Sequence, residues 1–153
     1  MDHVVGAELA WAASHAGYPT LRFNYRGVGG SQGKRGKGAS LVEDALAAIE
    51  VATDNAGGAK PFIASIGASA AVALELQRHA AGICLVSPTE IDVSMLEGSD
   101  MWVLVAQADL SSAPRVATGR LNVIPGADRT FQKNLPMVGR AVVECLKAVE
   151  TLD

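Results

Sequence analysis

Short, almost continuous apolar runs alternate along this chain with longer segments of mixed polarity. In four segments the apolar side chains recur with the spacing of an amphipathic helix: 3–16, 40–54, 70–79 and 137–152. Five shorter segments predict strands: 20–25, 62–66, 82–87, 101–106 and 121–124, of which 82–87 and 101–106 are almost continuously apolar. Runs that are apolar throughout are typical of strands buried on both faces, as in a parallel sheet between two helix layers.

This alternation predicts a single α/β domain over residues 1–153, a three-layer sandwich with helices on both faces of the sheet. The sheet is expected to be mostly parallel, with about five strands joined by right-handed crossovers. Between Ala106 and Leu121 only fourteen residues remain, close to the minimum of about 10–12 for a parallel return. The helix in that crossover is therefore expected to be short, irregular or absent.

Composition favours a packed globule with few charged partners. Apolar residues make up 49% of the 153 residues and charged residues 19%, with a net charge of −3. No basic field for nucleic acid is present, no run approaches the ~20 apolar residues of a membrane span, and the start does not resemble a signal peptide. Cys84 and Cys145 fall on apolar positions and are interpreted as buried small hydrophobes. We expect a cytoplasmic protein without metal or cofactor.

A glycine-rich stretch, Arg26–Gly33, follows the first predicted strand and raises the question of a phosphate-binding loop. Its third glycine falls one residue late for the dinucleotide pattern GxGxxG, and Gly33-Lys34 is followed by Arg35 rather than by the Ser or Thr of a Walker A loop. A tight polar connection is the favoured interpretation. A nucleotide-binding module stays as an alternative.

The run GYPTLRFNYRGVGGSQG, residues 17–33, resembles a hallmark of small bacterial serine hydrolases related to the dienelactone hydrolases, a group with the α/β-hydrolase fold. Residues 43–48 and 123–128 fit the same family in the same order. The resemblance implies a nucleophilic serine on a strained strand-to-helix elbow, an acid after a later strand and a histidine after the last strand. In such a triad the histidine accepts the proton of the serine, and the acid orients the histidine.

Within this resemblance the elbow lies in the stretch SIGASAA, residues 65–71, and two registers are open. One reads residues 67–71 as G-x-S-x-A, with Ser69 as the nucleophile. The other is anchored by residues 70–74, which resemble the helix that follows the elbow in the family. It places Gly67 at the nucleophile position and Ser65 at the first glycine, so that no nucleophile remains. We favour the second register.

The sequence has a carboxylate at the acid position of the family but no histidine at the base position. Asp109, in the segment AQAD, falls on the acid position of the family, although an aspartate in a polar turn is an equal alternative. The family ends its last strand in P-G-A-D-H, whereas this chain has Arg129 in place of the histidine. The three histidines, His3, His15 and His79, all precede the last strand. Arginine stays protonated near neutral pH, so it cannot replace a general base that contributes roughly 10²–10⁴ in rate.

Arg129 is expected to form a salt bridge with Asp109. Alternatively it faces the N-terminus of the 70–79 helix, where Ala70 begins the helix, and there binds a small carboxylate or phosphate. The favoured hypothesis is a hydrolase relative with weak or lost catalysis that binds a small anion or a protein partner. The alternative is a carboxylic-ester hydrolase that uses Ser69 and Asp109.

The resemblance also implies a central strand and an oxyanion loop before the first helix, for which the sequence has no counterpart. In the family that strand lies between the strands corresponding to 20–25 and 62–66. We therefore expect either that these two strands pair directly or that a second copy of the chain, or upstream residues, fills the place. An apolar strand edge left open promotes association, so a homodimer is one of these expectations.

Overall fold

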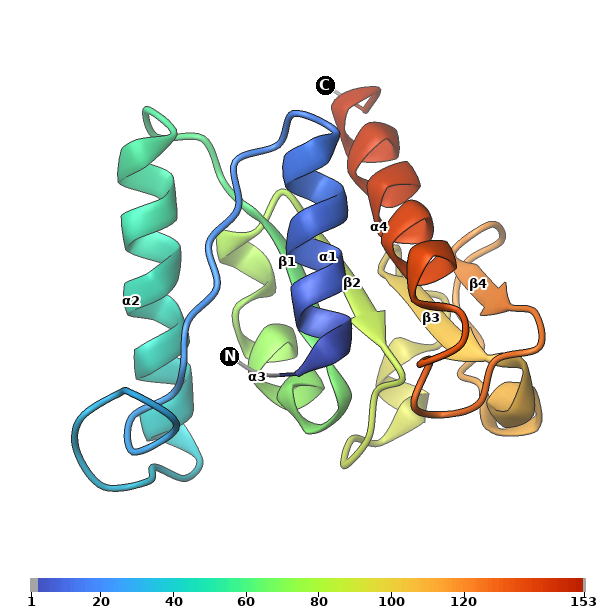
Figure 1. Cartoon of the computed structure of the whole chain (residues 1–153), viewed down its shortest axis with the longest axis horizontal. Helices are drawn as coiled ribbons and strands as arrows, with labels where there is room; N and C mark the ends of the chain where they lie inside the picture. Colours follow the sequence, from blue (N-terminus) through green and yellow to red (C-terminus); the bar gives the residue numbers. More distant parts are fainter. Residues whose placement is uncertain (1–2, 153) are drawn as a thin grey trace.

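The computed structural model describes residues 3–152, which fold as alternating helices and strands. The helices are α1 (Val4–His15), α2 (Ala39–Asn55), α3 (Ala70–Glu75) and α4 (Leu135–Glu150). The strands are β1 (Phe62–Ile66), β2 (Gly82–Val86), β3 (Trp102–Ala106) and β4 (Leu121–Ile124). They form one parallel sheet in the order β1-β2-β3-β4 (Figure 1).

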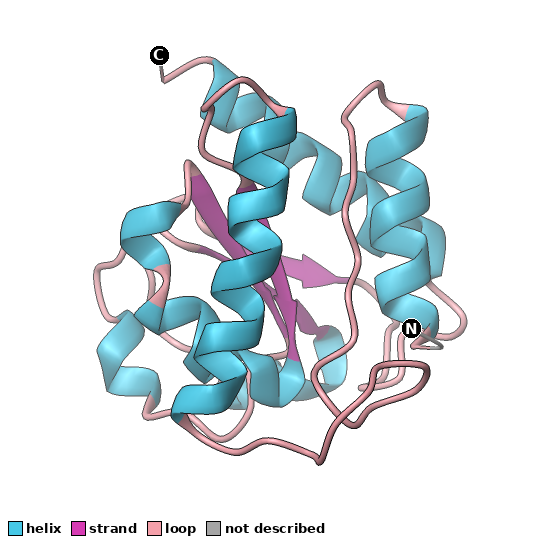
Figure 2. Ribbon diagram, turned by 90° about the vertical axis from the view of Figure 1, so that its left-hand side faces the viewer, coloured by secondary structure: helices cyan, strands magenta, loops and turns pink. Residues whose placement is uncertain are grey.

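Helices cover both faces of this sheet, as the sequence pattern predicted (Figure 2). On one face α1 and α4 pack against the strands through the side chains of Val5, Leu9, Val138, Val142 and Cys145. On the other face lie α3 and a short 3-10 segment, Val93–Leu96, which contribute Ala70, Ala73 and Leu96. The chain is thus a three-layer α/β sandwich.

The burial of β3, one of the two inner strands, shows why a parallel sheet suits this sequence. All five of its residues are buried, and Val103 and Leu104, which point to opposite faces, are both fully covered. Burying a side chain of this size contributes roughly 1.5–3 kcal/mol. A strand apolar on both sides is stable only where helices cover both faces, which parallel crossovers provide.

The close approach of α1 to α4 depends on a glycine. A Cβ atom added to Gly139 would lie 2.8 Å from the Cβ of Ala12 and would also collide with the carboxylate of Glu8. The two helices therefore touch through their smallest side chains, and any larger residue at this point must push them apart.

The prediction of a strand over 20–25 is wrong, and among residues 3–152 the sheet has four strands rather than five. This segment is extended, but it runs beside α2 without joining the sheet (Figure 1). Its end is fixed by Arg26, whose backbone N–H and guanidinium both donate to Asp44 of α2. Tyr25 packs with α2 and α3. These anchors hold the segment against the helix, so the predicted direct pairing with β1 does not occur.

Strand β1 consequently forms an open edge of the sheet within the described part of the chain. The N–H of Ala81 donates to the carbonyl of Pro61 over 2.9 Å, so odd-numbered residues of β1 direct their backbone groups to β2. Because strands have a period of two, the backbone groups of Phe62, Ala64 and Ile66 face the other way. Ala64 is also exposed to solvent.

Two helical predictions are refined by the structure. The helix predicted over 70–79 ends at Glu75, and a 3-10 turn, Gln77–His79, completes the segment. The crossover between β3 and β4 contains only a 3-10 helix, Gln107–Ser112, which confirms the expectation from its length. The last helix begins at Leu135, two residues earlier than predicted, because Pro136 favours a first helical turn.

Candidate functional site

Loops that follow β1, β2, β3 and β4 meet at the carboxyl edge of the sheet, where open parallel sheets bind ligands. The residues that leave the strands are Gly67, Ser87, Gln107 and Pro125. The candidate residues predicted from the sequence, Ser69, Asp109 and Arg129, all lie in these loops or in the first turns that follow them.

The turn from β1 to α3 has the backbone of an elbow, and glycine occupies its apex. Ile66 is extended, with φ −124° and ψ 128°, and Gly67 then takes a φ of +59°. A left-handed residue between a strand and a helix is the strained position at which hydrolases place the nucleophile. A Cβ at Gly67 would meet nothing closer than the Oγ1 of Thr89 at 3.8 Å, so the position has room for a side chain.

Ser69 lies two residues beyond this apex. It has an ordinary right-handed backbone, with φ −68° and ψ −7°, inside the 3-10 turn Gly67–Ser69. Its side chain lies beside the phenol of Tyr25. Burial is the main cause that raises the pKa of Tyr25, against the opposing effect of Ser69. Ser69 is thus next to a neutral phenol and lies outside the strained position.

Two serines that sequence analysis did not treat as candidate nucleophiles contribute buried hydroxyls near the elbow. The Oγ atoms of Ser65 and Ser87 are buried, with no hydrogen-bond partner among the described residues. Ser87 also has a φ of +43°, rare for a residue with a side chain. The N–H of Thr89 donates to the carbonyl of Gly67 over 3.2 Å, which ties the loop after β2 to the elbow. The one signal of Ser65 and Ser87 in the sequence is that both lie at or near the end of a predicted strand.

Asp109 and Arg129 form the expected ion pair. The Nε of Arg129 donates to the Oδ1 of Asp109 over 2.7 Å. The carboxylate side chain is only 16% exposed, whereas the arginine side chain is 80% exposed. The pair therefore has a covered acceptor and a guanidinium that extends into solvent.

The loop that carries Arg129 is held firmly between β4 and α4. The N–H of Gly126 donates to the Oε1 of Gln107 over 2.6 Å, and Phe131, with a φ of +54°, is buried as an anchor. Asp128 accepts hydrogen bonds from the hydroxyl and the N–H of Thr130, and these lower the pKa of its carboxyl. Arg129 is thus placed by a structured turn.

The histidines lie on other elements. His15 ends α1, and His79 ends the 3-10 turn after α3, where its Nε2 accepts a hydrogen bond from the Nε of Arg78 over 3.3 Å. His3 precedes α1. Among residues 3–152 no group of three or more His, Cys, Asp or Glu side chains is placed to hold a metal ion. In the same range no helix is long and apolar enough to cross a bilayer.

The anchor of the glycine-rich loop is a second charged cluster, which sequence analysis missed. Arg26 donates from Nε and from its backbone N–H to Asp44, at 2.8 Å each, and approaches Glu43 at 3.1 Å. The hydrogen bond from the Arg26 side chain is the main cause that lowers the pKa of Asp44, and the same contact raises the pKa of Arg26. This network fixes the start of the loop.

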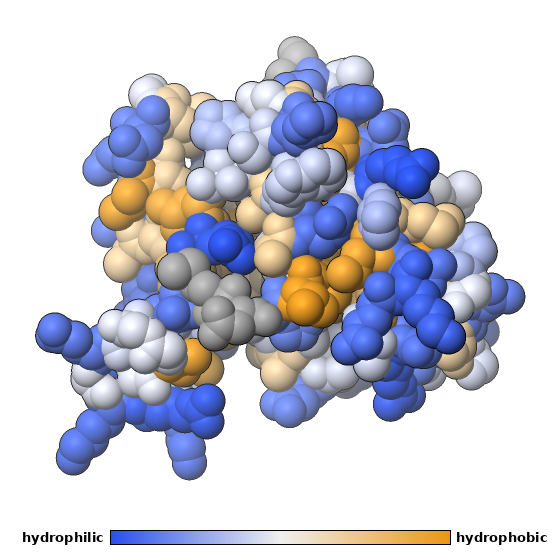
Figure 3. Space-filling model, viewed as in Figure 1, coloured by the Kyte–Doolittle hydropathy of each residue, from blue (hydrophilic) through white to orange (hydrophobic). Residues whose placement is uncertain are grey.

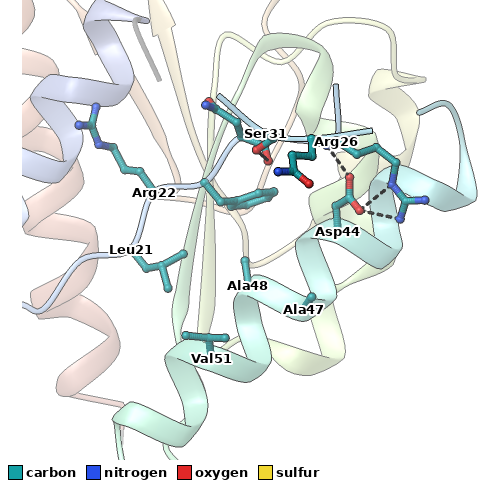
Figure 4. A pocket seen from close by; sticks show the side chains of 11 residues that line it. Leu21, Arg22, Arg26, Ser31, Asp44, Ala47, Ala48 and Val51 are labelled. Carbon is teal, nitrogen blue, oxygen red and sulfur yellow. Dashed lines mark hydrogen bonds and ion pairs between the residues drawn. The ribbon is translucent and has the colours of Figure 1, made fainter. Parts of the chain in front are cut away.

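Beside this anchor an open groove of about 510 Å³ runs between the extended segment and α2 (Figure 4). Its apolar lining comes from Leu21, Phe23, Ala47, Ala48 and Val51. Figure 3 shows apolar surface over this part of the molecule. The groove exists because the extended segment lies on α2 and leaves Leu21 and Phe23 partly exposed.

The parallel sheet, the helix layers and the elbow after β1 define an α/β-hydrolase-like fold. Two solved structures share this fold. An α/β serine hydrolase homologue from Coxiella burnetii superimposes with a TM-score of 0.76 at 22% identity, covering 95% of this chain and 77% of that chain. A protein of unknown function from Agrobacterium tumefaciens, a candidate α/β hydrolase, gives a TM-score of 0.73 at 20% identity, covering 96% and 77% of the respective chains.

A relative in sequence is an uncharacterized protein from Rickettsia prowazekii. It is 26% identical in an alignment that covers 88% of this chain and 67% of the relative. No family model matches the chain. The fold is therefore that of the α/β hydrolases, and the solved structures that share it include a serine hydrolase homologue.

Proposed function

We propose that this chain is a hydrolase-like protein that binds a ligand at the carboxyl edge of its sheet and has lost efficient ester hydrolysis. The observation that carries the proposal is Gly67 at the apex of the elbow, with a φ of +59°. A nucleophile needs a hydroxyl or thiol at this strained position, and glycine supplies neither.

The base position supports the same conclusion. Arg129 holds the place after β4, and its Nε is bound to Asp109. A guanidinium is always protonated near neutral pH and cannot accept the proton of a serine. Ser69, the alternative nucleophile, lies beside Tyr25, whose raised pKa keeps the phenol protonated near neutral pH, so that it cannot accept the proton of the serine.

The ligand that suits this edge is a small carboxylate or phosphate. Arg129 is held through Nε, so its terminal nitrogens extend from an 80% exposed side chain and can bind two oxygens of one anion. The amide of Ala70 contributes nothing to this proposal, because its N–H donates to the carbonyl of Gly67. Helix α3, of six residues, is also too short to provide a strong dipole. The proposed anion site therefore rests on Arg129.

A fluorophosphonate probe tests the loss of catalysis. We expect no adduct on the wild-type chain, and no turnover of p-nitrophenyl acetate above that of the Ser69→Ala variant. An adduct on the wild type that disappears in Ser69→Ala would instead establish the esterase.

Calorimetric titration with inorganic phosphate tests the anion site. Charge-assisted hydrogen bonds contribute about 1.5–3 kcal/mol, so Arg129→Gln should weaken binding by roughly 10- to 100-fold. Arg140→Gln changes another exposed arginine, on α4, and serves as the matched control. Equal binding by both variants would contradict the site, and a thermal shift with ATP or NAD would favour the nucleotide-binding alternative.

A homodimer is the second part of the proposal. Strand β1 keeps an open edge with an exposed Ala64, and open strand edges favour association. The molar mass measured by light scattering after size exclusion tests this, and a strict monomer at high concentration would contradict it.

A further inference from the structure

The groove between the extended segment and α2 is bordered by a helix that the rest of the chain covers poorly. Within Ala39–Asn55, the seventeen residues of α2, only Ala45 is buried, whereas the sixteen residues of α4 include five buried ones. Leu21 and Val51, which lie on opposite sides of the groove (Figure 4), are 45% and 51% exposed. The volume of about 510 Å³ falls within the range of roughly 300–1,000 Å³ that ligand pockets have. The groove therefore has room and apolar surface for side chains of another molecule.

The extended segment also offers main-chain groups to such a molecule. Among residues 3–152 neither Leu21 nor Phe23 forms a hydrogen bond with another backbone group. Alternate residues of an extended chain direct their N–H and C=O groups to the same side. A peptide that lies along an edge of this kind gains main-chain hydrogen bonds, while its alternate side chains enter a neighbouring groove. The segment is thus suited to an extended peptide.

One end of the groove is positively charged. Ser31 and Gln32 of the glycine-rich loop line this end, and three exposed cations follow closely in the sequence, Lys34, Arg35 and Lys37. In the described part of the chain no carboxylate lies within ion-pair distance of any of the three. The protein as a whole carries a net charge of −3, so the loop is a local concentration of unpaired positive charge. Such a patch favours an acidic partner.

The loop holds these cations in a closed conformation at the base of α2 (Figure 1). The N–H of Gly27 donates to the carbonyl of Gln32 over 3.1 Å, and a Cβ at Gly27 would lie 2.7 Å from the carbonyl carbon of Lys34. A Cβ at Gly36 would lie 3.3 Å from the Cδ of Arg26, which itself lines the groove. The cations are therefore next to the groove, on a loop that is ordered before any partner binds, which lowers the entropic cost of binding.

We propose that the groove and the basic loop together bind an extended segment of a partner protein in which acidic residues adjoin alternating apolar side chains. The apolar side chains pack beside Leu21, Phe23 and Val51, and the acidic residues contact the three cations of the loop. A nucleic acid would find the cations but would leave the apolar groove and the strand edge unused. The site shares no residue with Asp109 and Arg129, so it is independent of the proposed anion site.

Fluorescence anisotropy with synthetic peptides tests the proposal. The labelled peptides DEDLTVTF and FTVTLDED present the acidic run in both chain directions, and their neutral counterparts carry Asn and Gln in place of the acids. At about 50 mM salt one acidic peptide should bind the wild type several-fold more tightly than its neutral counterpart, and about 1 M salt should remove that difference. Arg35→Glu should weaken the acidic peptide roughly three- to tenfold and leave the neutral one unchanged. Arg115→Glu reverses an exposed arginine outside the groove lining and should change neither.

A second pair of variants tests the groove itself. Ala47 is exposed and lines the groove, so Ala47→Gln keeps a good helix former while filling the space, and all four peptides should bind about tenfold more weakly. Ala7→Gln makes the same change at an exposed position of α1 and should have no effect. Arg129→Gln should also leave peptide binding unchanged, which separates this site from the phosphate site.

Three results would overturn the proposal. The first is that neither acidic peptide binds the wild type more tightly than its neutral counterpart, which decides the question without any variant. The second is that Ala47→Gln leaves acidic-peptide binding unchanged and that a poly-uridine oligonucleotide displaces the peptide, because the loop would then be a general polyanion site. The third is that Ala47→Gln lowers the molar mass measured by light scattering and leaves peptide binding unchanged, because a second copy of the chain would then cover the groove.

Discussion

Replacing Gly67 by serine places a hydroxyl at the apex of the elbow and tests the reasoning about the site directly. The added Cβ meets no atom closer than 3.8 Å, so steric overlap contributes nothing to the cost. The backbone cost remains, because a φ of +59° disfavours L-residues by about 1–2 kcal/mol. In a chain of this length that corresponds to a decrease of roughly 2–8 °C in the thermal midpoint.

Gly67→Ala is the matched control, because it carries the same Cβ without the hydroxyl. The two variants should lose the same stability, measured by calorimetry or circular dichroism. The serine variant should differ from the alanine variant only when a base is restored, so we combine Gly67→Ser with Arg129→His. That double variant should react with the fluorophosphonate probe, and Gly67→Ala with Arg129→His should not.

Two results would refute this reasoning. If Gly67→Ala leaves the midpoint unchanged or raises it, the backbone at this residue is not strained and the elbow has been misplaced. If the double serine variant stays unreactive while the wild type is labelled at Ser69, the nucleophile lies two residues further on and the other register is correct.

Three further outcomes follow from the structure. Gly139→Val should cost about 1–3 kcal/mol of the free energy of unfolding, because its side chain must separate α1 from α4; a neutral result in a urea titration would contradict the close crossing. Asp44→Asn should destabilise the protein at neutral pH, since the contact with Arg26 holds the pKa of this carboxyl low. That contribution is complete above the ordinary pKa of about 3.9 and is lost as pH falls through the lower folded value, so melting curves of both proteins should converge in acid and stay apart if the reasoning fails. Ala64→Pro should leave the sheet intact, because its N–H faces away from β2, and should abolish the proposed dimer, whereas Ser65→Pro, which removes a bond to β2, should cost about 3 kcal/mol or more; equal melting temperatures for the two proline variants would refute the assigned strand orientation.

Much of the fold could be predicted from the sequence, because it depends on local patterns. The apolar runs at 82–87 and 101–106 are strands that need cover on both sides, and the structure covers them. The helices of 3–16 and 137–152 were equally clear from their spacing. The arginine after the last strand is a property of the sequence itself. No folding could place an imidazole at that position.

The extended segment before Arg26 shows where local patterns fail. The alternation of polar and apolar residues in 20–25 is compatible with a strand, but a strand needs a partner whose position is set by the rest of the chain. The bond between Arg26 and Asp44 draws the segment onto α2, and the sheet ends at β1. Pairing is a long-range event, so the sequence of the segment alone did not determine it.

The elbow and the composition of the core depend on the tertiary structure in the same way. The sequence SIGASAA, residues 65–71, permits either register, and the left-handed backbone at Gly67 is imposed by the turn that joins β1 to α3. Cys84 and Cys145 are ordinary apolar positions in their own segments, and only the packing of α4 on the sheet places both in the same core. The sequence by itself determined which segments bury their side chains, and that an arginine rather than a histidine follows the last strand. The tertiary structure decided which distant groups meet, because those contacts arise only when the layers have packed.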